Sequence, residues 1–150
     1  MKISAIEGEL LVPEIRSFAG ALHDETARAR YEELRVAVED GEVGDELIGH
    51  LGNVLEIGLQ SGRLRRFYGA DGEATLARVF RRTPSGVALS EAASDVTHAL
   101  TALHGQNLED IQVSALGPGS YGLTIDTDRC QINLRLDRSG VRVENVAIGI

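Results

Sequence analysis

The chain is poor in aromatic residues, cysteine and lysine. Its 150 residues include no tryptophan, three tyrosines and three phenylalanines, so the core must be built from aliphatic side chains. The single cysteine, Cys130, excludes an intramolecular disulfide and a cysteine-based zinc site, and it indicates a reducing compartment. Long apolar runs are missing and acids occur within the first ten positions, so neither a signal peptide nor a membrane span is predicted. These absences predict a cytoplasmic protein without a membrane partner.

The rest of the composition is that of an ordinary globular protein. Hydrophobic residues make up 43% of the chain, and no internal repeat, low-complexity tract or flexible linker is present. A chain of this length can bury one sizeable core, whereas two independent cores would each be small. The prediction is a single domain over 1–150, mainly helical in 1–107 and an antiparallel sheet in 108–150.

Apolar residues recur with helical spacing in the first two thirds of the chain. The spacing slips between Leu22 and Ala27, which predicts two helices or one kinked helix over 13–38, opened by Pro13 and with Asp24 capping the second part. Further helices are expected over 45–60 with Asp45 as cap, over 71–82 and over 90–104, with a short helical turn at 64–67.

Three glycines, Gly49, Gly52 and Gly58, lie inside the helix expected over 45–60. Each costs about 1 kcal/mol relative to alanine in a helix interior, so this helix must depend on tertiary packing. Close crossing of a neighbouring helix over Gly49 and Gly52 is the simpler explanation, and approach of a ligand to the backbone is the alternative.

After residue 107 the helical spacing gives way to strict alternation of apolar and polar residues. A turn at Thr127–Asp128 would place Leu123 opposite Ile132. The expected buried face comprises Leu123, Ile125, Ile132, Leu134, Leu136, Val141 and Val143, and the opposite face Thr124, Gln131, Asn133 and Arg135.

A second turn, at Ser139–Gly140, preserves the same apolar face. It would also bring Arg135 to Glu144 and Asp137 to Arg142 as opposite-charge pairs. The alternation fails once, after Glu144, which predicts a β-bulge near residue 145. The predicted fold is therefore α+β: about four or five N-terminal helices packed on one face of a C-terminal four-stranded antiparallel meander.

Charge is unevenly distributed along this chain, whose formal net charge is −8. Residues 7–56 hold thirteen acids and four arginines, a net charge of −9, whereas residues 61–82 hold six arginines and two acids, a net charge of +4. We call the six arginines the arginine cluster: Arg63, Arg65, Arg66, Arg78, Arg81 and Arg82.

The arginine cluster has two explanations. At least two of its members are expected to lie near acids of residues 7–56, within the chain or across a dimer. The alternative is contact with phosphate or nucleic acid, with Phe67 and Tyr68 as a stacking surface. The negative net charge disfavours nucleic acid, because it repels a polyanion. The cluster is thus the candidate surface for an anion or a partner.

Two motifs match ligand-binding signatures but are better explained by turns. Residues 117–122, GPGSYG, spell GxGxxG, yet a strand rather than a helix follows, and Pro118 removes a backbone donor. Asp126 and Asp128 flank a tight hairpin turn without the further oxygen ligands that a hard cation needs. No cofactor and no metal site is predicted.

Two histidine–carboxylate pairs are the remaining catalytic candidates. Glu46 with His50, and Asp95 with His98, could each form a dyad or half of a metal site. Their spacings are more typical of solvated contacts on helix surfaces. Cys130 falls on the inward side of its strand, which favours a packed thiol over a nucleophile. No catalytic residue is assigned.

These features predict a non-catalytic protein-interaction or assembly module that can form a homodimer. The alternatives are a nucleic-acid-associated regulatory protein that uses the arginine cluster, and a small enzyme with a histidine–carboxylate site. The apolar C-terminal residues 146–150 are expected to be ordered, either packed against a helix or paired with a second subunit.

Overall fold

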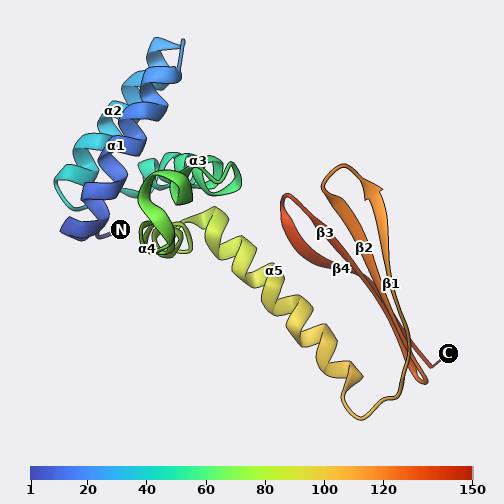
Figure 1. The fold of residues 1–150 in the computed structure, drawn as a ribbon. Helices are drawn as coiled ribbons and strands as arrows, with labels where there is room; N and C mark the ends of the chain where they lie inside the picture. Colours follow the sequence, from blue (N-terminus) through green and yellow to red (C-terminus); the bar gives the residue numbers. More distant parts are fainter. Residues whose placement is uncertain (150) are drawn as a thin grey trace. The chain divides into compact units, whose positions relative to one another are not determined.

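The α+β class predicted from the sequence is confirmed by the computed structural model, which describes residues 1–149 (Figure 1). The chain divides into two compact units: a helical unit, Met1–Val87, and a sheet unit that begins at Ala88. No helix within the described residues is long and apolar enough to cross a membrane. The elements are α1 (Ala5–Ala21), α2 (Glu25–Glu39), α3 (Asp45–Gln60), α4 (Arg63–Phe80), α5 (Pro84–Leu100), a 3₁₀ turn (Thr101–Leu103), β1 (Leu108–Gly117), β2 (Ser120–Thr127), β3 (Cys130–Asp137) and β4 (Gly140–Ile148).

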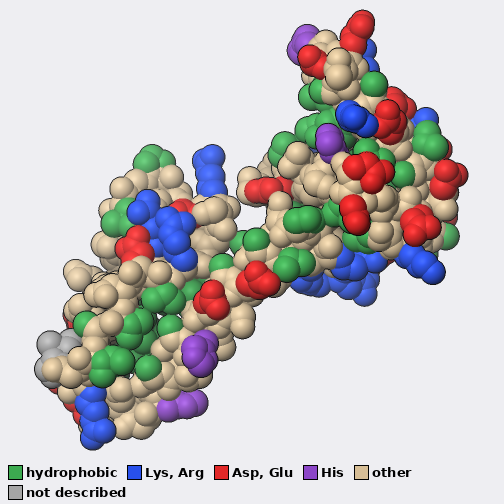
Figure 2. Space-filling view, turned by 180° about the vertical axis from the view of Figure 1, so that it is seen from behind, with side chains coloured by type: hydrophobic (Ala, Val, Ile, Leu, Met, Phe, Trp, Pro, Cys, Tyr) green, Lys and Arg blue, Asp and Glu red, His purple; other side chains and the backbone are tan. Residues whose placement is uncertain are grey.

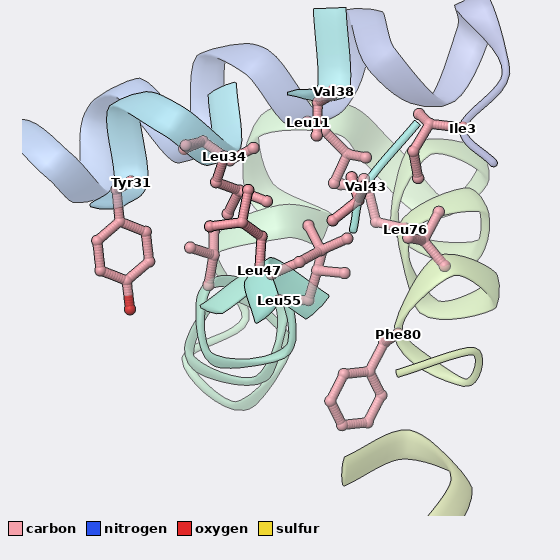
Figure 3. Close-up of a cluster of buried hydrophobic side chains, with 14 of the residues drawn as sticks. Ile3, Leu11, Tyr31, Leu34, Val38, Val43, Leu47, Leu55, Leu76 and Phe80 are labelled. Carbon is pink, nitrogen blue, oxygen red and sulfur yellow. The ribbon is translucent and has the colours of Figure 1, made fainter. Parts of the chain in front are cut away.

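The helical unit encloses an almost entirely aliphatic core, as the scarcity of aromatic residues predicted. Helices α1 to α4 surround Leu11, Leu34, Leu51, Leu55 and Leu76, none of which is exposed. Figure 3 shows side chains from α1, α2, α3 and α4 pointing toward one another in this cluster. These helices therefore share a core of their own.

The first helix begins earlier than Pro13, so that part of the prediction was wrong. Ser4 caps α1 with its side chain, and Glu7 reaches back to the Ser4 backbone, which completes a capping box. Pro13 lies inside α1. The predicted second helix is confirmed, since the Asp24 carboxylate accepts a hydrogen bond from the Ala27 backbone N–H at 2.6 Å.

Three other helix starts differ from the prediction. Gly44, not Asp45, is the N-cap of α3. The break expected between the short turn at 64–67 and the helix over 71–82 is found at Gly69, with φ of 68°, so the second part of α4 starts before residue 71. The last helix starts at Pro84 rather than Ser90, because proline fits the first helical turn and the Thr83 hydroxyl accepts a hydrogen bond from the Gly86 N–H.

Two of the three glycines in α3 lie where another part of the chain packs closely against the helix, and Gly49 does not. A β-carbon at Gly52 would lie 3.3 Å from the Thr83 Oγ1, and one at Gly58 would lie 2.9 Å from the Leu64 side chain. Apart from its own turn of helix, no atom lies within 4 Å of such a β-carbon at Gly49, so the crossing predicted over Gly49 is not found.

In the sheet unit, α5 packs on one face of a meander whose strand order is β1-β2-β3-β4. Val96 of α5 contacts the inward side chains of β3, which are Cys130, Ile132 and Leu134. The packed thiol expected for Cys130 is confirmed, since the side chain is buried. Figure 1 shows α5 lying along the sheet.

Both predicted hairpin registers were wrong by two residues, although the faces were right. Leu123 lies opposite Leu134 rather than Ile132. The turn falls one residue later than expected because the Thr127 hydroxyl donates to the Cys130 carbonyl at 2.8 Å and accepts from the Cys130 N–H at 2.9 Å. A shift of two positions leaves every side chain on its face.

The second hairpin is also shifted by two residues, but in the opposite direction, since its turn falls one residue earlier than expected and Asp137 lies opposite Gly140. The predicted ion pairs nevertheless form, Arg135 with Glu144 at 3.5 Å and Arg142 with Asp137 at 3.1 Å. Their long side chains reach diagonally across the strands.

The predicted bulge in β4 is confirmed. Val143 lies opposite Leu134 and Asn145 opposite Asn133, which leaves Glu144 as the extra residue. The bulge restores the phase of the strand, so Val146 lies opposite Ile132 on the face that α5 covers.

Most of the predicted apolar face is buried or half-buried, and the opposite face is polar. Leu136 is the exception, because it is exposed together with its cross-strand neighbour Tyr121. On the other face the Thr124 hydroxyl donates to the Asn133 side-chain carbonyl at 2.8 Å.

The C-terminal prediction is met only in part. Residues 146–148 are ordered as the end of β4, paired with β3, but Val146 and Ile148 are exposed rather than packed into the core. Pairing with a second subunit stays a prediction, and Ile150 lies outside the described residues.

Candidate interaction surfaces

The arginine cluster divides into members that pair with acids far away in the chain and members that do not. Arg63 lies 3.0 Å from Glu14, and Arg82 lies 2.7 Å from Glu7. Two members therefore lie near acids of residues 7–56, as predicted. The first bond ties α4 to α1, and the second ties α1 to the residues that follow α4.

Glu14 is the buried centre of the first contact, with only 5% of its surface exposed. One carboxylate oxygen accepts from Arg63 Nε, and the other accepts from the Tyr68 hydroxyl at 2.8 Å. Arg63 also donates to the Ser17 hydroxyl at 3.1 Å. A hollow of about 160 Å³ adjoins the group and is lined in part by Glu14, Ser17 and Arg63. Because both carboxylate oxygens have partners, this arrangement serves as an internal counter-charge.

The second contact, between Arg82 and Glu7, stabilises the start of α1. Burial alone would raise the pKa of Glu7, but the hydrogen bond from the Ser4 backbone and the pair with Arg82 outweigh it and hold the pKa below its usual value. Arg82 also donates to the Lys2 carbonyl at 2.9 Å. This arginine therefore fastens the N-terminal segment to the end of α4.

Tyr68→Phe should make the decline in stability at alkaline pH smaller than it is in the wild type. Burial, followed by the hydrogen bond and charge of Glu14, raises the pKa of Tyr68 from 10.0 to about 12. Tyr68 therefore ionises at a lower pH in the unfolded chain than in the folded state. The contribution of Tyr68 to the free energy of unfolding is complete below pH 10 and is lost as pH rises toward 12. Urea unfolding between these pH values measures it. Tyr121→Phe, at an exposed tyrosine of the sheet, is the control and should retain the wild-type decline.

The remaining arginines leave a surface that the helical unit does not neutralise. Arg65 makes only an exposed pair with Glu73, at 3.7 Å. Arg66, Arg78 and Arg81 are exposed and form no ion pair among residues 1–149. Figure 2 shows Lys and Arg side chains gathered at one edge of the helical unit, beside a surface rich in acids.

Phe67 and Tyr68 do not form the shared stacking surface that the sequence suggested. Tyr68 turns inward to Glu14, whereas 63% of Phe67 is exposed. The Arg63 guanidinium lies 4.7 Å from the centre of the Phe67 ring, a cation–π contact. A single aromatic ring therefore projects among arginines.

An open groove of about 840 Å³ lies between α2 and the start of α3. Sequence reasoning missed it because its walls come from two helices. We call it the acidic groove, and its lining residues are Ala29, Glu32, Glu33, Val36, Ala37, Asp40, Glu42, Gly44, Glu46 and Leu47. Glu32 and Glu33 pair with Arg35 and Arg30, respectively. Asp40, Glu42 and Glu46 pair with no cation among residues 1–149, which leaves the groove negatively charged.

In the sheet unit the outer strand β1 exposes its apolar side chains. Ile111 and Val113 lie opposite Ile125 and Leu123, so they share the face on which α5 packs. They are nevertheless 53% and 68% exposed, and Leu108 is 58% exposed. We call Leu108, Ile111 and Val113 the β1 strip. The alternation of β1 predicted its faces, but it carried no signal that the strip would be uncovered.

The motifs that resembled ligand sites have structural roles. Gly117 and Ser120 bound the hairpin between β1 and β2, as predicted for GPGSYG. The Asp128 carboxylate accepts from the Asn107 N–H at 3.0 Å, and Asp126 accepts from the Gln131 side chain at 2.6 Å. Both aspartates therefore brace the hairpin.

The histidine–carboxylate pairs are not joined by a hydrogen bond within the described residues. His50 instead lies edge-on to the Tyr31 ring, with 5.3 Å between ring centres. In the part of the chain that the structure describes, no three His, Cys, Asp or Glu side chains are grouped as metal ligands. No known family, curated protein or solved structure matches the chain.

Proposed function

We propose that the chain is a non-catalytic protein-interaction module that assembles with a second copy of itself along β1. The observation that carries this proposal is the uncovered β1 strip. Its three side chains continue the apolar face of the sheet beyond the area that α5 covers. A long apolar edge strand promotes pairing with another chain unless the edge is covered.

A second copy suits this edge because β1 can pair with itself. Register shifts at both ends of β1 confine its regular pairing to residues 110–115. An antiparallel contact about a twofold axis at Gln112 would set Ile111 of one copy opposite Val113 of the other. The two acids of β1, Glu109 and Asp110, would then lie at opposite ends of the contact rather than against each other.

Replacing Ile111→Thr and Val113→Thr together should convert a dimer into a monomer. Threonine retains strand propensity, so the change removes apolar contact without weakening the strand. The matched control is Gln112→Thr with Ser114→Thr on the polar face of the same strand, which should remain dimeric. Sedimentation velocity over a range of concentrations measures the mass. A wild-type chain that is monomeric throughout, or a strip variant that dimerises as well as wild type, would contradict the proposal.

A further inference from the structure

Phe67 is an exposed aromatic ring of the helical unit, with one arginine against the ring and two more just before it in the helix. Its ring is 63% exposed and carries Arg63 on one side. The neighbouring Arg65 is exposed, and Arg66 forms no ion pair among residues 1–149. We call Phe67, Arg65 and Arg66 the aromatic knob. Exposed aromatic rings and arginines are the types of group that dominate binding energy at protein interfaces.

The acidic groove has the complementary chemistry. Val36, which is 46% exposed, contributes apolar surface together with Ala29, Ala37 and Leu47. Acids without a cation partner in residues 1–149 stand beside it, namely Asp40, Glu42 and Glu46. Apolar surface bordered by acids suits contact with an apolar ring that is accompanied by guanidinium groups.

We propose that the aromatic knob of one copy docks into the acidic groove of a second copy. Phe67 would cover Val36, and Arg65 and Arg66 would face Glu42 and Glu46. The same chain carries both halves, and Phe67 does not line its own groove. Charge complementarity therefore identifies a second copy as the occupant.

This contact goes beyond the proposed function, because it uses the helical unit and joins two different surfaces. A contact between unlike surfaces builds rings or open chains rather than closing at a dimer. It also depends on charge, so added salt should weaken it, whereas salt does not weaken contact along the apolar β1 strip. Salt dependence thus separates the two contacts.

Charge reversal on either side should abolish the contact, and mixing the two variants should restore it. The knob variant is Arg65→Glu/Arg66→Glu, and the groove variant is Glu42→Arg/Glu46→Arg. Each variant alone sets like charges against each other. In the mixture, each reversed surface meets a surface of opposite sign, and each unchanged surface meets its original partner. Sedimentation velocity at low and high salt measures mass as a function of concentration.

Phe67→Ser tests the ring itself and should weaken the association about tenfold or more. Because Phe67 is exposed, the change leaves the core intact. The charge control is Arg16→Glu/Arg129→Glu, which alters net charge as much as the knob variant does but at two exposed arginines outside both surfaces. This control should associate like wild type.

All variants are also prepared with Ile111→Thr/Val113→Thr, so that the outcome does not depend on β1. Association that weakens with salt, is lost in both charge variants and returns on mixing supports the proposal. Unchanged mass in either charge variant, or no recovery on mixing, overturns it. Loss of low-salt binding to labelled nucleic acid in the knob variant, with self-association unchanged, also overturns it and assigns the arginines to a polyanion.

Discussion

Gly86→Ala should lower the free energy of unfolding by about 3 kcal/mol. A β-carbon at this position would lie 2.0 Å from the Phe80 carbonyl oxygen and 2.7 Å from the Arg81 Cα. Both are backbone atoms at the end of α4, so no side-chain rotation relieves the clash. The turn between α4 and α5 must therefore move, although Thr83 is buried within it.

Urea unfolding followed by helical circular dichroism measures this effect. The matched control is Gly49→Ala, which lies inside α3 with no atom beyond its own turn of helix within 4 Å of the new β-carbon. That substitution should raise the free energy of unfolding by about 1 kcal/mol, because alanine favours a helix. Equal stability of wild type and Gly86→Ala would show that the turn relaxes without strain.

Glu14→Ala should lower the free energy of unfolding by about 2 kcal/mol. Removing one member of a buried ion pair leaves its partners without their hydrogen bonds, here Arg63 and Tyr68. The effect lies below that of a fully buried pair because the Arg63 side chain is 41% exposed. Part of the lost stability therefore comes from the Tyr68 hydroxyl, which no longer has a carboxylate to donate to.

A double-mutant cycle measures the interaction energy between Glu14 and Arg63, apart from their contacts with other residues. The variant Glu14→Ala/Arg63→Ala should lose about 1 kcal/mol less than the sum of the two single variants. The control cycle uses Arg30 and Glu33, an exposed pair on α2, and should show a coupling of about 0.3 kcal/mol. Equal coupling in the two cycles would contradict a special role for Glu14.

Sequence patterns predicted which residues form helices and which face of the sheet is apolar, because both follow from periodicity. They predicted helix starts less well. The capping box at Ser4 and Glu7 is visible in the sequence, but Pro13 drew attention instead. Strand register escaped prediction because a shift of two residues preserves the faces, and the Thr127 side chain decides between the two registers.

The candidate surfaces depend on contacts between distant residues, which no local pattern contains. Glu14 and Arg63 are 49 positions apart. One signal was available, since Glu14 shares a helix face with Leu11 and Ile15, both buried. An acid on an apolar face implies a buried partner. The acidic groove and the β1 strip had no such signal, because alternation and charge do not show which faces a neighbouring helix covers.

The first part of α4 is bounded by two glycines with positive φ, Gly62 with φ of 69° and Gly69 with φ of 68°. Within the helical unit this short piece is held by Leu64 against Gly58 and by the bonds of Glu14. Glycine takes these backbone angles without the steric cost that other residues meet, so the chain can turn sharply at both ends of the piece. Leu64 is fully buried and Tyr68 packs against the core, so the piece is anchored on its inner side. The exposed Phe67 ring is therefore presented from an anchored segment.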